Sequence, residues 1–172
     1  ADTREWLGVM EEAAALSMKA SATMMFGHVE TLEERVLHLE RLRQTQERTR
    51  DAEGLGVFRA FACWPYQDDN TALGAGGASA FEYLRVLAVA RLYLDNIPNI
   101  QASWVTQGPK VGQVSLDFGC NDLGGTMMEE NVVSAAGTTY RVGPAEAIRL
   151  IRDAGFIPAR RNTRYEILER YS

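Results

Sequence analysis

Hydrophobic and polar positions along the chain follow two spacings, one typical of helices and one typical of buried strands. Residues 3–16 carry apolar side chains at near-helical spacing, and residues 19–26 (KASATMMF) form a compact apolar run that ends at Gly27. This order predicts a helix followed by a buried strand. Thr31 with Glu34 three residues later matches a capping box and predicts the start of a long helix. Its expected inner face is Leu32, Val36, Leu39 and Leu42.

The alternation of strand and helix patterns continues to about residue 137, and one further helix pattern follows. Residues 51–56 predict a turn and residues 57–64 (VFRAFACW) a strand, followed by a long glycine-rich loop. Further on, the patterns predict a helix over 79–95, a strand over 99–104, a helix that begins at Pro109, a strand over 116–121, a helix over 127–136 and a last helix from Pro144 to Gly155.

This order has no hairpin signal between successive strands, so it requires right-handed crossovers and a parallel sheet. The fold class is therefore α/β. Four strand-helix units in the first 137 residues predict half of a (β/α)8 barrel with outer helices, over residues 1–142, and residues 143–172 are expected to pack on it as a C-terminal helix and tail. Half a barrel has two open edges, so we expect a missing N-terminal half-barrel, a partner chain or a second copy to cover them.

Composition narrows the class of protein. The chain has 172 residues, of which 46% are hydrophobic, enough for one core, and its net charge of -5 argues against a nucleic-acid partner. No apolar stretch reaches the ~20 residues of a membrane helix, so we expect no membrane association and a cytoplasmic location. Cys63 and Cys120 lie within apolar strand patterns; we interpret them as buried thiols, with a disulfide as the alternative.

Polar residues gather where the predicted strands end. In a parallel α/β protein, ligands bind at the carboxyl ends of the strands, since the loops there are free to carry chemistry. The residues expected at this edge after the later strands are Gln101, Trp104, Asn121, Asp122, Thr126 and Glu129. They predict a site for a small polar molecule.

Two segments, TMMFGHVETLEERVLHLERLR and NIQASWVTQGPKVGQVSLDFGCNDLGGTMMEENVVSAAGTTYR, carry a more specific signal. Over nearly the whole chain the sequence resembles the carboxyl half of the radical S-adenosylmethionine enzymes of futalosine and deazaflavin biosynthesis. Within that family it is most similar to the cyclases of the futalosine route to menaquinone. GHVET, NIQASWV and NDLGGTMMEENV are the most specific parts.

The resemblance implies a barrel in which a CxxxCxxC loop holds a [4Fe-4S] cluster that binds S-adenosylmethionine and reduces it to a 5′-deoxyadenosyl radical. In the cyclases this radical takes hydrogen from a nucleoside-like substrate, which then closes a ring. The chain contains no CxxxCxxC. We therefore expect it to be inactive alone, either as a fragment or with the cluster ligands supplied by a partner chain.

Thr23, Met25, Gly27 and Glu30 fall on the spacing of the GxIxGxxE element, which in this superfamily lies along the adenine of the cofactor. The resemblance thus implies a cofactor contact at these four positions. An apolar strand end can support a flat base, and a glycine allows close approach. The alternative is that the methionine is part of the core, Gly27 makes a turn and Glu30 favours the next helix.

The remaining candidates carry weaker signals. His28 is a candidate proton carrier or a structural histidine, and Glu129 a candidate proton acceptor or a solvated acid. The amides of Gln67 and Asn70 are candidates for reading a neutral sugar or base. Gln101 and Ser103 should share one strand face, and Trp104 either stacks on a ring or packs in the core.

At the last strand exit, Asn121, Asp122 and Thr126 are expected to bind the substrate beside a glycine turn, or simply to form and cap that turn. Two other activities fit the same motifs: aminofutalosine synthase and the deazaflavin synthase subunit. A non-catalytic half-barrel that binds a ligand or assembles with a partner is the alternative of another class.

Overall fold

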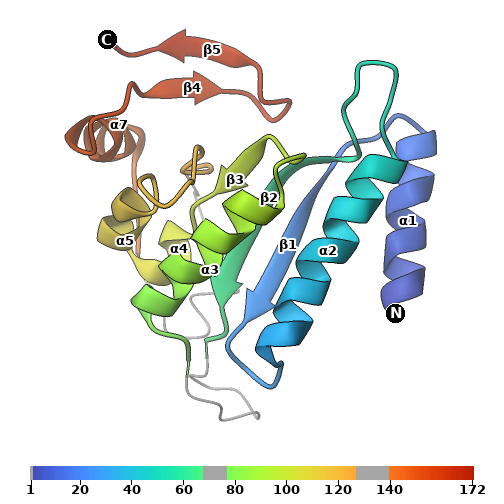
Figure 1. The fold of residues 1–172 in the computed structure, drawn as a ribbon. Helices are drawn as coiled ribbons and strands as arrows, with labels where there is room; N and C mark the ends of the chain where they lie inside the picture. Colours follow the sequence, from blue (N-terminus) through green and yellow to red (C-terminus); the bar gives the residue numbers. More distant parts are fainter. Residues whose placement is uncertain (1, 68–76, 127–139) are drawn as a thin grey trace.

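A three-stranded parallel sheet forms the centre of the protein. The computed structural model describes residues 2–67, 77–126 and 140–172. The strands β1 (Ala20–Phe26), β2 (Phe58–Pro65) and β3 (Asn99–Gln101) lie in the order β1-β2-β3, all parallel. Figure 1 shows α2 (Leu32–Arg48) and α3 (Ala80–Tyr93) packed over one face of this sheet, with α1 (Thr3–Ala15) beside α2. The α/β class and the parallel strands are confirmed.

The rest of the described chain lies beyond β3. Two short helices, α4 (Trp104–Gln107) and α5 (Pro109–Val114), follow β3, and α7 (Pro144–Asp153) packs against α5. The chain ends in an antiparallel hairpin of β4 (Ala159–Arg161) and β5 (Ile167–Arg170). No helix among the described segments is long and apolar enough to cross a membrane.

The two faces of the sheet differ sharply. On β1, Met24 and Phe26 are buried beneath α2 and α3, whereas Thr23 and Met25, which point the other way, are exposed. The register carries this pattern across the sheet, because Thr23 lies opposite Ala62 and Ala62 opposite Gln101. We call the side that α2 and α3 leave uncovered the open face; its members are Ser21, Thr23, Met25, Ala60, Ala62, Trp64, Asn99 and Gln101.

Local signals for the helix starts are borne out. The capping box predicted at Thr31 is present, with the Glu34 amide donating to Thr31 Oγ1 and the Glu34 carboxylate accepting from the Thr31 amide. The helices predicted at Pro109 and Pro144 begin at those residues. The inner face of α2 is predicted only in part, because Leu39 and Leu42 are buried while Leu32 is 64% exposed and Val36 44%. Leu32 and Val36 line an outer groove between α2 and α3.

Two predicted strands need correction. The strand expected over 99–104 ends at Gln101, and Trp104 instead begins α4. The strand expected over 116–121 does not form. There the amides of Leu116, Asp117 and Phe118 donate three residues back, and Gly119 closes the turn at φ +95°. Because these local bonds already satisfy the backbone, a single parallel bridge among the described residues, from Gln101 to Asp122, continues the sheet.

The C-terminal hairpin was not predicted. Its strands are mostly charged and exposed, so they lack the alternating hydrophobic pattern on which strand prediction depends. The helix expected over 127–136 lies outside the described residues.

Candidate functional site

The carboxyl ends of β1 and β2 lie side by side and form the first part of the candidate site. The Tyr66 amide donates to the Phe26 carbonyl at 2.7 Å, which fixes the two strand exits together. The His28 ring then meets the Tyr66 ring edge-on, with 5.8 Å between their centroids. Gln67 follows directly, and its side-chain Nε2 donates to the Pro65 carbonyl at 3.0 Å. His28 and Gln67 are therefore brought to the same edge, as predicted from the strand order.

Glu30 organises the turn that leaves β1. Its carboxylate accepts from the amides of Gly27 at 2.6 Å and His28 at 3.0 Å, and from Arg35 Nε at 2.7 Å. Burial alone would raise the pKa of Glu30, but these donors outweigh it and lower the pKa from 4.5 to about 2. Arg35 also donates to Glu82 at 2.6 Å. The Glu30 carboxylate thus stays ionised and, through Arg35, connects the turn to α2 and α3.

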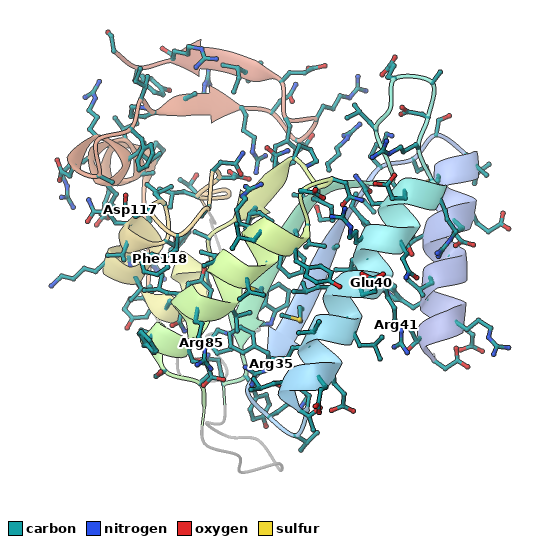
Figure 2. All side chains as sticks on the ribbon, viewed as in Figure 1. Arg35, Glu40, Arg41, Arg85, Asp117 and Phe118 are labelled. Carbon is teal, nitrogen blue, oxygen red and sulfur yellow. The ribbon has the colours of Figure 1, made fainter. Side chains whose placement is uncertain are left out.

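Arg35 provides the link to the core. Its guanidinium lies 5.0 Å from the centre of the Phe26 ring, at the last residue of β1. Figure 2 shows Arg35 on α2, with Arg85 of α3 nearby, at the end of the helix layer where β1 ends. The described contacts of the Glu30 carboxylate are with protein groups, so they assign it a positioning role. Its direct contact with a cofactor stays a prediction.

Gly27 is the residue whose conformation the turn requires. Its φ is +87°, and an added Cβ would lie 2.9 Å from the Ala78 Cβ. Only glycine adopts this φ without strain and permits so close an approach. Beside it on the open face, Met25 is 47% exposed and Thr23 is also exposed. Thr23, Met25 and Gly27 therefore present an accessible, partly apolar strand end, and their contact with an adenine stays a prediction.

Gln101 and Asp122 continue the open face. The Gln101 side chain lies against Gly124, where an added Cβ would be 2.7 Å from Gln101 Nε2. Asp122 is the bridge partner of Gln101, and its carboxylate accepts from the Gly124 amide at 2.9 Å and from Arg161 Nη2 at 2.5 Å. Two predicted substrate residues are thus neighbours around one glycine turn.

Asn121 points elsewhere. Its Oδ1 accepts from the Ile100 amide at 2.8 Å and from Arg91 at 2.9 Å, and its Nδ2 donates to the Pro98 carbonyl at 3.2 Å. These bonds clamp it to the beginning of β3, away from the carboxyl edge. The described contacts give Asn121 a structural role, and its contact with substrate stays a prediction.

Trp104 is only 5% exposed and belongs to the hydrophobic core, where its Cβ lies 2.7 Å from the position of a Cβ added at Gly112. This favours packing over stacking on a ligand. Ser103, beside it, donates to or accepts from Thr106 at 2.8 Å. Thr126 is exposed at the end of its described segment, and Asn70 and Glu129 lie outside the described residues.

Sequence reasoning missed Arg161 and Tyr165. Arg161 lies 39 residues after Asp122 in a charged tail, so nothing local signals their contact. The Arg161 guanidinium lies 4.0 Å from the centre of the Tyr165 ring. Such a pair could be found only from coordinates.

The residues present fit one of the two cofactors that the resemblance implies. The strand end at Thr23, Met25 and Gly27 suits the adenosine part of S-adenosylmethionine. Within the described ranges no group of three or more His, Cys, Asp or Glu side chains could hold a metal ion, and both cysteines are buried. The described residues therefore do not fit an iron–sulfur cluster.

Comparison with known proteins decides the family. A family model described as the CofH/MqnC C-terminal region matches residues 54–172. The chain belongs to this family. The resemblance to enzymes of futalosine and deazaflavin biosynthesis is thereby confirmed.

The most similar curated relatives include two cyclic dehypoxanthine futalosine synthases. The one from Halalkalibacterium halodurans is 47% identical over 168 residues, which cover 97% of this chain and 44% of the relative. The one from Streptomyces coelicolor is 49% identical over 164 residues, 95% of this chain and 40% of the relative. A 5-amino-6-(D-ribitylamino)uracil–L-tyrosine 4-hydroxyphenyl transferase from Archaeoglobus fulgidus is 40% identical over 172 residues, 97% of this chain and 48% of the relative. The chain spans less than half the length of these relatives.

Proposed function

We propose that this chain is the carboxyl-terminal part of a radical S-adenosylmethionine cyclase that converts dehypoxanthine futalosine to cyclic dehypoxanthine futalosine in menaquinone biosynthesis. The observation that carries the proposal is the identity of 47% over nearly the whole chain with a cyclic dehypoxanthine futalosine synthase. The open face supports it, because it carries polar side chains of β1 and β3, together with the bridged Asp122, opposite the helix layer.

The architecture that accompanies this proposal is half of a (β/α)8 barrel. Residues 1–142 would supply the carboxyl half and residues 143–172 a helix and tail that pack on it. The exposed row of Thr23 and Met25 supports this, since in a closed barrel that face would be interior. The cluster ligands would come from the part of the relatives that this chain does not match, or from a partner chain.

The proposed roles follow the geometry. When bound, S-adenosylmethionine and its cluster supply one-electron hydrogen abstraction. Met25 and Thr23 would support the adenine, Gly27 would let the backbone approach it, and Glu30 would hold that turn through three hydrogen bonds. A cluster within the full-length enzyme would be bound by other residues.

The substrate would lie over the neighbouring strand exits. Gln67, Asn70, Gln101 and Thr126 would read its polar groups, since amides and a hydroxyl bind sugar and base edges without adding charge. The carboxylate of Asp122, whose charge Arg161 balances, would accept from a donor group of the substrate. His28, with Glu30 Oε2 3.5 Å from its Nδ1, and Glu129 are the proposed proton carriers. Either could accept the proton released when the ring re-aromatises.

Product analysis tests the reaction. The full-length, cluster-reconstituted enzyme should convert dehypoxanthine futalosine to the cyclic product with formation of 5′-deoxyadenosine. If it instead transfers the 4-hydroxyphenyl group of L-tyrosine to 5-amino-6-(D-ribitylamino)uracil, the proposal is wrong. This second activity is the runner-up, because the transferase from A. fulgidus is 40% identical over 97% of the chain.

A matched pair of glycines tests the cofactor site. Gly27→Ala should weaken binding of S-adenosylmethionine at least tenfold, because it strains the φ of +87° and collides with Ala78. Gly54→Ala imposes the same strain at φ +80° with open space around it, and should leave binding unchanged. Equal binding by the two variants would remove Gly27 from the site.

A further inference from the structure

The C-terminal hairpin reaches the open face at Asp122, which Arg161 and Tyr165 both approach. Arg161, the last residue of β4, donates from Nη2 to Asp122 Oδ2 at 2.5 Å. The Asp122 side chain is only 10% exposed and that of Arg161 23%. Water screens such a pair much less than a surface pair, so the contact is both strong and geometrically fixed.

The turn of the hairpin is built to support this arginine. Tyr165 lies in the left-handed region at φ +67°, which is uncommon for an aromatic residue. Asn162 Oδ1 stabilises the turn by accepting from the amides of Arg164 and Glu166. The result places the Tyr165 ring against the Arg161 guanidinium at 4.0 Å. Burial, and then the nearby Asp122 carboxylate, raise the pKa of Tyr165 to about 12, so the ring stays a neutral partner for the cation.

On the other side, Asp122 holds the glycine turn of the candidate site. Its Oδ1 accepts from the Gly124 amide, and Gly124 at φ +81° packs against the Gln101 amide. A continuous series of contacts therefore runs from Tyr165 through Arg161, Asp122 and Gly124 to Gln101.

We propose that Arg161 is a positioning residue: by holding Asp122 and the Gly124 turn, it sets the position of the Gln101 side chain on the open face. Its effect on substrate binding rests on the proposed function. Figure 1 shows the hairpin at the opposite end of the molecule from the β1–α2 connection. Arg161 thus approaches from the side away from the candidate adenine site, and acts through Asp122.

One feature of Arg161 argues against simple attachment of the tail. Its Nε is buried and has no hydrogen-bond partner among the described residues. An apolar side chain would hold the hairpin without leaving a buried donor unpaired, whereas the guanidinium of Arg161 gives the Asp122 carboxylate a charge-assisted hydrogen bond.

Nuclear magnetic resonance of the protein tests the series of contacts without any activity. Arg161→Gln should move the resonances of the Gly124 amide and the Gln101 side-chain amide, and Arg161→Lys should move them less. Arg160→Gln is the matched control, because Arg160 precedes Arg161 on β4 but pairs with Glu169 at the surface and is 61% exposed. Unchanged Gly124 and Gln101 resonances in folded Arg161→Gln would overturn the proposal. If that variant does not fold, the Arg161→Lys spectrum decides in the same way.

Kinetics of the full-length enzyme test the consequence for substrate. Arg161→Gln should raise KM for dehypoxanthine futalosine about tenfold and raise the ratio of 5′-deoxyadenosine to cyclic product, with partial rescue in Arg161→Lys. A merely structural role would lower both products in proportion at constant KM, and that result would overturn the proposal. If the wild-type enzyme does not turn over this substrate, the proposed function fails, while the resonance test of the Arg161–Gln101 series still stands.

Discussion

Glu30→Gln is the most informative single change, because the turn after β1 depends on the negative charge of this side chain. The variant keeps nearly the same shape but removes the charge that receives the Gly27 and His28 amides and Arg35 Nε. It also directs an NH2 group toward at least one of these donors. Among the described residues, Arg35 would keep Glu82 as its acidic partner.

The magnitude follows from the lowered pKa. The pKa of Glu30 falls from 4.5 to about 2 in the folded protein. Each pKa unit corresponds to about 1.4 kcal/mol, so ionised Glu30 stabilises the fold by roughly 3 kcal/mol at pH 7. Because the folded pKa is the lower one, this contribution is fully present above pH 4.5 and is lost as the pH falls toward 2. At pH 3 about 1.4 kcal/mol should remain.

Urea denaturation at both pH values measures this difference. Glu30→Gln should lower the free energy of unfolding by about 2–3 kcal/mol at pH 7 and by about half of that at pH 3. Glu33→Gln, at an exposed position in the first turn of α2, should change it by less than about 0.5 kcal/mol. A loss at pH 7 no larger than that of this control, or one that stays constant down to pH 3, would refute the reasoning.

Two further predictions concern the core. The Gln46 side chain is 1% exposed and forms hydrogen bonds with both the backbone amide and the carbonyl of Phe58. Gln46→Leu should therefore lower the free energy of unfolding, measured by urea denaturation, by about 2–4 kcal/mol. Gln44→Leu, on the exposed side of α2, should change it by under about 0.5 kcal/mol. Equal losses would show that the buried amide contributes nothing specific. Burial raises the pKa of Cys63 to about 12 and that of Cys120 to about 11. Neither thiol should therefore react with Ellman's reagent at pH 8 until the protein unfolds. Rapid labelling of the native protein would contradict this prediction.

The sequence by itself determined the parts of the fold that depend on local chemistry. Three kinds of local signal each encode an element within a few residues. They are the capping box at Thr31, the prolines that begin α5 and α7, and the apolar run of β1. The sequence also predicted that the strands run parallel. Because His28 and Gln67 each follow one of these strands, they lie at the same edge of the sheet. Its motifs were specific enough to assign the family.

Only the tertiary structure decided how the candidate side chains are used. Asn121 and Asp122 are adjacent in the sequence, yet one clamps the start of β3 while the other faces the Gly124 turn. Glu30 was predicted beside the cofactor, but its described contacts hold the turn. The contact of Arg161 with Asp122 joins residues 39 positions apart, and no periodic pattern encodes such a pair. Local spacing fixes which backbone hydrogen bonds can form, whereas the direction and partners of a polar side chain depend on what distant segments bring beside it.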